Sequence, residues 1–442
     1  ILIKKNIEYK IFDEVEVDPS FEVVNKALNK VIDFLPDIIV GIGGGSSLDT
    51  AKSIKYFIKK SNLHIPLIAL PTTSGTGSEV TSYAVLTDKK NNIKIPLKDD
   101  EMIPEYAILD PELTKTLPKS VVADSGIDAL THAIESYTCK GANFYTKMYA
   151  LSAIRLIFKN LLRMYRDIKD EEARTEMAKA SCIAGFAFEK SGLGINHSVA
   201  HAIGGKFHIA HGKINGIILP YVIRFNSEDK TTAQRYYEIS KDLGFPANSI
   251  EEGAESLALA VELLNKSLNL PSCVKDLAID EEKYRNEIEF MSKSALEDIC
   301  TSGNIREVNL EDLKKLFGGA ENWELLKKTA QESKDGYTDF TTLYGQKQEL
   351  SKKWFADLEE KDFATLMQEV KLSYNGPSMV IYAVDDTAVS PSVSKSVANE
   401  LGSEIIMTPE DGHSYGFYSD KTYVKRIVVE NTVDFFEDKL AR

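Results

Sequence analysis

The sequence has few of the features that mark secreted or membrane proteins. Only 4 of its 442 residues are cysteine, and they form no Cys-x-x-Cys pair. This scarcity argues against a disulfide framework and is typical of a reducing compartment, so we expect a cytoplasmic protein. No apolar run in the sequence approaches the roughly 18 residues of a membrane-spanning helix. We therefore expect no membrane partner.

The chain also has fewer basic residues than acidic ones. The chain has 53 lysines and arginines against 67 aspartates and glutamates, a net charge of −14. Such a surface repels a phosphate backbone on average, so nucleic acid is not an expected partner. The 43% hydrophobic content is that of a globular protein, and the length predicts about three domains at roughly 150 residues each.

The known phosphate-binding signatures are absent, but a related pattern is present. The segment DIIVGIGGGSSLDTAK (37–52) contains neither G-x-G-x-x-G nor G-K-[ST], because Ser46 stands where the last glycine would be. It nevertheless predicts a strand, a glycine turn and a helix over 47–59. Such a turn lets a phosphate approach the free N–H groups that begin a helix. Asp49, three residues after Ser46, is expected to complete a helix cap. A plain tight turn is the alternative to a phosphate site.

A second loop of small residues follows the next predicted strand, 66–70. Its sequence is PTTSGTGSEVT (71–81). Two such loops at successive strand ends predict a binding crevice at the edge of a parallel sheet. We therefore predict an α/β dinucleotide-binding domain over residues 1–122.

The pattern then changes twice along the chain. Apolar residues at three- and four-residue spacing, for example over 150–164 and 254–268, predict an all-α domain over 123–318. After Gly318 and Gly319 we predict a charged helical stretch over 321–371. Strands over 379–384 and 404–407, with helices between and after them, then predict an extra α/β segment, so that 319–442 forms a third part.

Histidines are concentrated in one short segment. Four of the seven lie between His197 and His211, and His197 and His201 are four residues apart. On a helix such a pair shares one face. We expect Gly204 and Gly205 to end this helix and let the chain bring His211 alongside. His64 and His208 are expected to be ordinary loop residues.

Upstream, Asp128 and His132 have the same four-residue spacing. Asp124 or Ser125 is expected to cap their helix. Three imidazoles and one carboxylate suit a divalent transition metal. Each pair alone is more often structural than ligating, but the two together with His211 favour a metal site.

Taken together, these motifs resemble the iron-containing (group III) alcohol dehydrogenases over residues 1–317. The histidine segment is most similar to the branch that acts on primary alcohols. The matching segments are GGGSSLDTAK (43–52), PTTSGTGSEVT (71–81), GIDALTHAIESY (126–137), GLGINHSVAHAIGGKFHIAHGKINGIILP (192–220) and LEDICTSGNIREVNLEDLKKLF (296–317).

The resemblance implies a site and a reaction. It implies hydride transfer between NAD or NADP and a small primary alcohol or aldehyde, with Fe²⁺ or alternatively Zn²⁺ as the metal. A homo-oligomer is compatible with it. The implied metal ligands are Asp128, His132, His197 and His211, with His201 as the proton relay. The implied cofactor-site residues are Asp18, Gly44, Gly45, Ser46, Thr72, Thr73, Thr81 and Lys94.

Members of this family normally have a further strand and helix before the segment that matches Ile1 onward. We therefore expect part of the dinucleotide fold to be missing, including the acidic residue that contacts the adenosine ribose. The choice between NAD and NADP stays open for this reason. A non-catalytic remnant that still binds metal is the alternative to an active dehydrogenase.

The C-terminal part resembles a different family. Residues 376–401 and 408–417 are similar to the last strands of an α/β-hydrolase, which implies Asp386 and His413 as acid and base of a triad. No serine in the sequence has the G-x-S-x-G context of a hydrolase nucleophile. An inactive half-sheet is therefore favoured over esterase activity.

Overall fold

The computed structural model describes residues 3–60, 63–90 and 93–318, together with 337–341, 347–351, 379–383, 394, 398 and 404–408. The chain divides into two compact units, Ile1–Glu321 and Asn322–Arg442. The expected division into domains 1–122, 123–318 and 319–442 stays a prediction.

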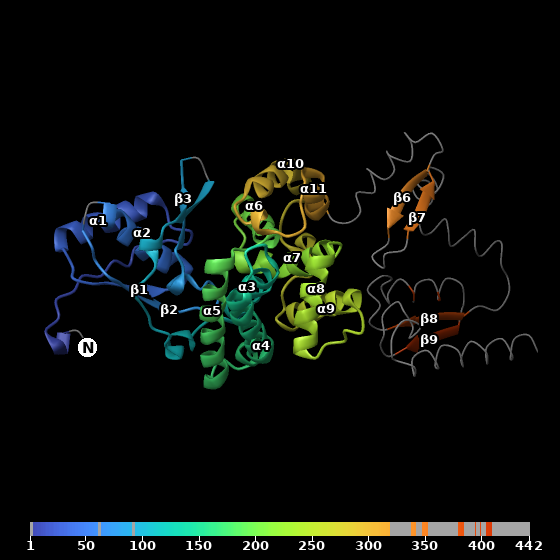
Figure 1. Cartoon of the computed structure of the whole chain (residues 1–442), viewed down its shortest axis with the longest axis horizontal. Coiled ribbons are helices and arrows are strands. Elements are labelled where there is room, and N and C mark those ends of the chain that lie inside the picture. Colours follow the sequence, from blue (N-terminus) through green and yellow to red (C-terminus); the bar gives the residue numbers. More distant parts are fainter. Residues whose placement is uncertain are drawn as a thin grey trace, which may run out of the picture. The chain divides into compact units, whose positions relative to one another are not determined.

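The first part of the chain is built on a parallel sheet (Figure 1). β1 (Ile39–Gly43) pairs in parallel with β2 (Leu67–Pro71), which pairs in parallel with β5 (Tyr106–Ala107). The helix α2 (Gly45–Lys60) connects β1 to β2, as the sequence predicts for a β-α-β unit. β1 continues through Gly43, so the phosphate-type turn lies at the carboxyl end of the strand.

Two further elements complete this α/β part. α1 (Phe21–Phe34) begins at Ser20, whose hydroxyl accepts a hydrogen bond from the Val23 N–H group. Its buried side chains form a small core with those of α2. β3 (Tyr83–Asp88) and β4 (Ile93–Lys98) form an antiparallel hairpin.

Residues 119–318 are helical, as expected. The main core is formed by side chains of α3, α4, α5, α7, α8 and α9, and a second core joins α6, α7, α10 and α11. The helices are α3 (Lys119–Thr138), α4 (Phe144–Arg166), α5 (Glu171–Ser191), α6 (Ile195–Phe207), α7 (His211–Asn226), α8 (Lys230–Leu243), α9 (Ile250–Ser267), α10 (Glu281–Glu297) and α11 (Leu310–Gly318).

Two predicted helix boundaries are wrong. α6 continues through Gly204 and Gly205 and ends only at His208, whose backbone is left-handed with φ 55°. Glycine inside a helix costs only about 1 kcal/mol, which the packing of α6 offsets. α3 begins at Lys119, so Asp124 lies inside the helix and does not cap it.

The second unit contains four described strands. β6 (Tyr337–Thr341) and β7 (Lys347–Ser351) form an antiparallel hairpin, so the predicted helix over 321–371 is wrong at these two strands. The aromatic and β-branched residues of β6 favour a strand. β8 (Met379–Ala383) and β9 (Glu404–Thr408) pair in parallel where strands are expected. Asp386 and His413 lie outside the described residues.

Among the helices of the described residues, none is both long enough and apolar enough to cross a membrane.

Candidate active site

Two potential metal ligands come from α3. Asp128 and His132 are one helical turn apart and are 3% and 6% exposed. The amide of Asn215, on α7, donates a hydrogen bond of 2.8 Å to Asp128 Oδ1. A buried carboxylate needs such a partner, because burial without hydrogen bonds is costly. The carboxylate is thereby held in one orientation.

α6 and α7 bring three histidines to the same place. His197 and His201 lie on α6, and the chain turns after His208 so that His211 is the first residue of α7. Gly212 allows the start of α7 to approach α3, because a Cβ atom there would lie only 2.0 Å from the Asp124 carbonyl oxygen. This close approach places His211 beside Asp128.

The four predicted ligands converge. The ligating atoms of Asp128, His132 and His197 all lie within 4.8 Å of one another. Asp128 Oδ1 is 4.0 Å from His197 Nε2 and 3.6 Å from His211 Nε2. The predicted clustering of these residues is therefore confirmed, while their role as ligands stays a prediction.

The state of the imidazoles suits a divalent metal. Burial lowers the pKa of His132 and lowers that of His197 well below its usual value. Burial also lowers the pKa of His211 to about 4, against the attraction of Asp128. Neutral imidazoles offer lone pairs. His197 Nε2 is buried and has no hydrogen-bond partner among the described residues, so the donor set fits a metal ion.

The environment of His197 contains a residue that sequence reasoning missed. His197 Nδ1 lies 2.5 Å from Glu135 Oε2, and Glu135 Oε1 accepts a hydrogen bond from the Asn196 N–H group. Metal-ligating histidines usually donate their other ring N–H to such a group, which fixes the tautomer. The available signal was the position of Glu135, one turn after His132 on the same helix.

The predicted cofactor loops also meet. The N–H group of Thr72 donates to the carbonyl oxygen of Gly43 at 2.9 Å. A Cβ atom at Gly44 would lie 3.3 Å from Thr73 Cγ2, and one at Gly45 would lie 2.9 Å from Thr76 Cγ2. The two loops therefore lie together at the carboxyl ends of β1 and β2, as expected.

Asp18, Ser46 and Lys94 form one side of this region. Lys94 Nζ lies 2.8 Å from Asp18 Oδ1, and the Asp18 N–H group donates to Ser46 Oγ at 3.3 Å. The Asp18 and Lys94 side chains are 49% and 31% exposed. Polar groups accessible to solvent at this position are available to a ligand.

A buried lysine on α2 is hydrogen-bonded to the second predicted cofactor loop. Lys52 Nζ, on α2, donates to the Ser78 carbonyl oxygen at 2.9 Å and to Thr81 Oγ1 at 3.1 Å. Asp49 does not cap α2 as expected; it accepts hydrogen bonds from the Ser78 hydroxyl and the Val85 N–H group. Burial lowers the pKa of Lys52 to about 8 despite these acidic neighbours.

The predicted cofactor loops and the predicted metal ligands are adjacent. A Cβ atom at Gly75 would lie 2.6 Å from Ser125 Cβ, so the second loop packs against α3 one turn before Asp128. The glycine is required for this close approach. A dinucleotide bound across the loops could therefore extend toward the metal ligands.

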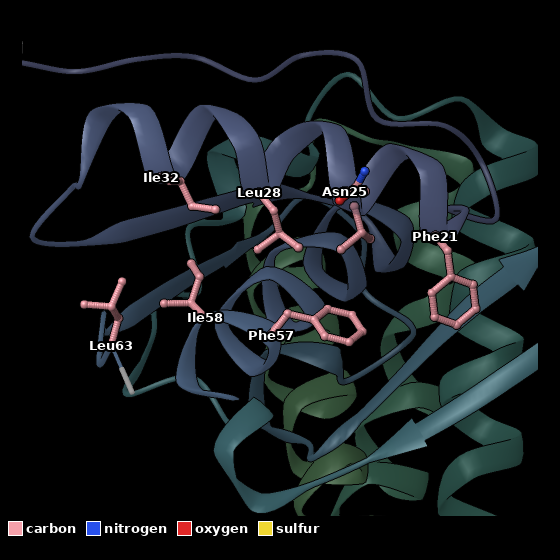
Figure 2. Close-up of a pocket in the computed structure, with 8 residues that line it drawn as sticks. Phe21, Asn25, Leu28, Ile32, Phe57, Ile58 and Leu63 are labelled. Atoms are coloured by element: carbon pink, nitrogen blue, oxygen red, sulfur yellow. The ribbon is translucent and has the colours of Figure 1, made fainter. Parts of the chain in front are cut away.

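A separate hollow lies between α1 and α2 (Figure 2). Phe21, Leu28 and Ile32 line it from α1, and Phe57 faces it from α2. None of the predicted metal or cofactor residues lines this apolar groove, so it is not part of the site.

Comparison with known proteins decides the family. Residues 1–111 match the profile of iron-containing alcohol dehydrogenases, and 122–320 match the C-terminal profile of the Fe-containing alcohol dehydrogenase family. The NADPH-dependent butanol dehydrogenase of Clostridium saccharobutylicum is 40% identical, over 72% of this chain and 84% of that protein. The chain belongs to the iron-containing alcohol dehydrogenase family. The fold of residues 1–318 is accordingly an α/β domain followed by a helical domain.

Other similar proteins support the same family assignment. A solved structure of 1,3-propanediol oxidoreductase superposes with a TM-score of 0.67 at 32% identity, covering 72% of this chain and 85% of that one. The aldehyde-alcohol dehydrogenase of Streptococcus pneumoniae serotype 4 is 39% identical, but the chain spans only 40% of its length. The family match ends at residue 320, so β6 to β9 lie beyond it.

Proposed function

We propose that this protein transfers hydride between NAD or NADP and a small primary alcohol or aldehyde, with Fe²⁺ in the site on α3, α6 and α7. Zn²⁺ fits the same donors. The names of its relatives, butanol dehydrogenase and aldehyde-alcohol dehydrogenase, support this substrate class.

One observation carries the proposal. Potential donor atoms of Asp128, His132 and His197 lie within 4.8 Å of one another, and His211 Nε2 lies 3.6 Å from Asp128 Oδ1. His197 Nε2 is buried there without a hydrogen-bond partner among the described residues. An unpaired buried nitrogen is costly in a purely structural cluster. A metal ion would satisfy it.

The four ligand residues would hold the ion, and Glu135 would keep His197 in the tautomer that ligates through Nε2. When bound, the ion supplies Lewis-acid polarisation, which lowers the pKa of an alcohol. His201, whose ring stacks on that of His211 at 5.1 Å between centroids, would accept the alcohol proton. Its side chain is 38% exposed, so the proton has a route to solvent.

The cofactor would bind across the two loops. The N–H groups that begin α2, at Gly44, Gly45 and Ser46, would meet the pyrophosphate, because a helix N-terminus attracts negative charge. The remaining side chains would surround the rest of the dinucleotide; they are Asp18, Thr72, Thr73, Thr81 and Lys94.

The test is to load the full chain with Fe²⁺ or Zn²⁺, measure metal content, and titrate NADH and NADPH by fluorescence before assaying alcohols. Stoichiometric metal, saturable dinucleotide binding and metal-dependent alcohol oxidation are the expected results. Metal without dinucleotide binding would favour the non-catalytic remnant. A protein that retains no metal under any loading condition would contradict the proposal.

Three finer expectations belong with it. A hydrolase-like origin of residues 319–442 rests on the sequence resemblance alone, and labelling of a serine by a fluorophosphonate probe would be needed to assign activity to it. A homo-oligomer is tested by light scattering, and a cytoplasmic location by cell fractionation.

A further inference from the structure

The predicted proton relay, His201, has a carboxylate partner that the sequence motifs did not reveal. Asp298 Oδ2 lies 2.9 Å from His201 Nδ1. Asp298 directly follows α10, 97 residues further along the chain. Its side chain is 18% exposed, so the contact is largely shielded from water.

The carboxylate of Asp298 is itself held in place. Its Oδ1 atom accepts hydrogen bonds from the Cys300 N–H group at 2.8 Å and from the Ser198 hydroxyl at 3.2 Å. The first is an Asx turn, which fixes the side chain to its own backbone. The second ties it to α6, three residues before His201. Oδ2 remains for the imidazole.

The ionisation of Asp298 is clear from its surroundings. Burial alone would raise its pKa, but the hydrogen bond and charge of His201, together with the bonds from Cys300, lower it to about 2. A carboxylate can only accept hydrogen bonds. The Nδ1 atom of His201 must therefore carry a proton, and in the neutral ring Nε2 has the free lone pair.

His201, Asp298 and Cys300 also contain three potential metal donors close together. The 2.9 Å contact is that of a hydrogen bond. Two ligands of one tetrahedral zinc ion, each at about 2.0–2.1 Å, would lie farther apart, roughly 3.3 Å. The contact therefore fits a His–Asp pair.

We propose that Asp298 is the positioning residue of His201, fixing its ring orientation and the Nδ1–H tautomer so that Nε2 exchanges the substrate proton. This rests on the proposed function. In alcohol oxidation the O–H proton passes to Nε2 while the C–H hydrogen leaves as hydride to NAD(P)⁺, giving an aldehyde and NAD(P)H. His201 then returns its proton to solvent, and Asp298 stays ionised throughout.

The first test is a double-mutant cycle. Asp298→Asn keeps the shape but no longer requires a proton on Nδ1, so kcat should fall about 10- to 100-fold. Metal content and NAD(P)H affinity should not change. Asp280→Asn is the matched control, since Asp280 caps the other end of α10 and lies outside the site. In a His201→Ala background, Asp298→Asn should lower kcat by less than about twofold.

The second test does not depend on activity. Histidine-selective ¹⁵N NMR of the zinc-loaded protein, with the His201 signal assigned from His201→Gln, reports which ring nitrogen carries the proton. We expect Nδ1–H in the unaltered protein and in Asp280→Asn, and a mixed or Nε2–H tautomer in Asp298→Asn.

The outcomes separate the two proposals. Absence of metal-dependent activity in the unaltered protein would contradict the proposed function, while the NMR result would still decide the tautomer. An Nε2–H tautomer in the unaltered protein would overturn the role of Asp298. If Asp298→Asn lowers kcat equally in the unaltered protein and in His201→Ala, the positioning role of Asp298 would also be overturned.

Discussion

The metal side and the cofactor side of this site are built in different ways. Asp128, His132 and His197 lie on helices and are at most 6% exposed. The predicted cofactor residues lie at strand ends, in loops and at the start of α2, and the Lys94 and Asp18 side chains are 31% and 49% exposed. Helical spacing and close packing fix the first set, whereas loop contacts fix the second.

This difference predicts different consequences of substitution. On the metal side, replacing a ligand should remove the ion, whereas replacing a residue that holds a ligand should only weaken its binding. On the cofactor side, several exposed groups are expected to contribute to cofactor binding. The buried Lys52 is expected to stabilise the fold through its hydrogen bonds to the second loop. Substitutions on the two sides should therefore differ in the size of their effects.

Replacing a central ligand should have the largest effect. His197→Gln should abolish stoichiometric metal binding and lower kcat/KM about a thousandfold or more, because the site loses its electrostatic stabilisation of the reacting oxygen. Elemental analysis and steady-state kinetics measure the two effects. His64→Gln, at an exposed loop position, is the control. Retention of metal by His197→Gln would contradict the predicted difference between the metal side and the cofactor side.

The buried lysine of the cofactor side should affect stability in a pH-dependent way. Burial lowers the pKa of Lys52 in the folded protein from its ordinary value of 10.5 to about 8. Between these values the unfolded chain binds more protons, so stability rises with pH. Relative to Lys52→Met, the protein should gain up to about 3 kcal/mol from pH 8 to 10.5. Denaturant unfolding measures this gain. Lys59→Met, an exposed change on α2, should show no such trend.

Replacing Glu135, which contacts the ligand His197, should affect metal binding less than replacing a ligand itself. Glu135→Gln removes the carboxylate beside His197 Nδ1, and metal affinity should fall about 10- to 100-fold. Competition with a chromogenic chelator measures this affinity. Glu282→Gln, at an exposed position of α10, supplies the reference. Unchanged affinity would mean that Glu135 does not orient the ligand.

An exposed residue of the cofactor side should have the smallest effect. Lys94→Met should weaken NAD(P)H binding about tenfold, since it removes one charged contact worth roughly 1.5 kcal/mol, and should leave metal content unchanged. The control is Lys89→Met. Lys89 lies on the same hairpin as Lys94 and forms a comparable exposed ion pair with Glu16. If both variants bind NAD(P)H equally well, Lys94 has no part in the cofactor site.

The sequence predicted the clustering of the metal ligands well because their spacing is local. Asp128 and His132, like His197 and His201, are placed together by one helical turn. The β-α-β unit was predictable for the same reason. The approach of α7 to α3, which brings in His211, depends on the packing of Gly212 against Asp124. No local sequence pattern predicts this packing.

The residues that were missed act across long separations. Asp298 reaches His201 from 97 residues away, and Asn215 reaches Asp128 from α7. Both are single polar side chains without a periodic pattern around them. The end of α6 was misplaced because tertiary packing overrode the low helix propensity of two glycines. In β6, aromatic and β-branched residues outweighed the charged pattern that suggested a helix.

We propose that Asp128, His132, His197 and His211 form one metal site. Anomalous diffraction at the iron or zinc edge, from crystals of the loaded full chain, locates the ion. We expect one strong peak at about 2.0–2.2 Å from an Asp128 oxygen and one nitrogen of each of the three histidines. A peak at His201, Asp298 and Cys300, or no peak among the four predicted ligands, would contradict it.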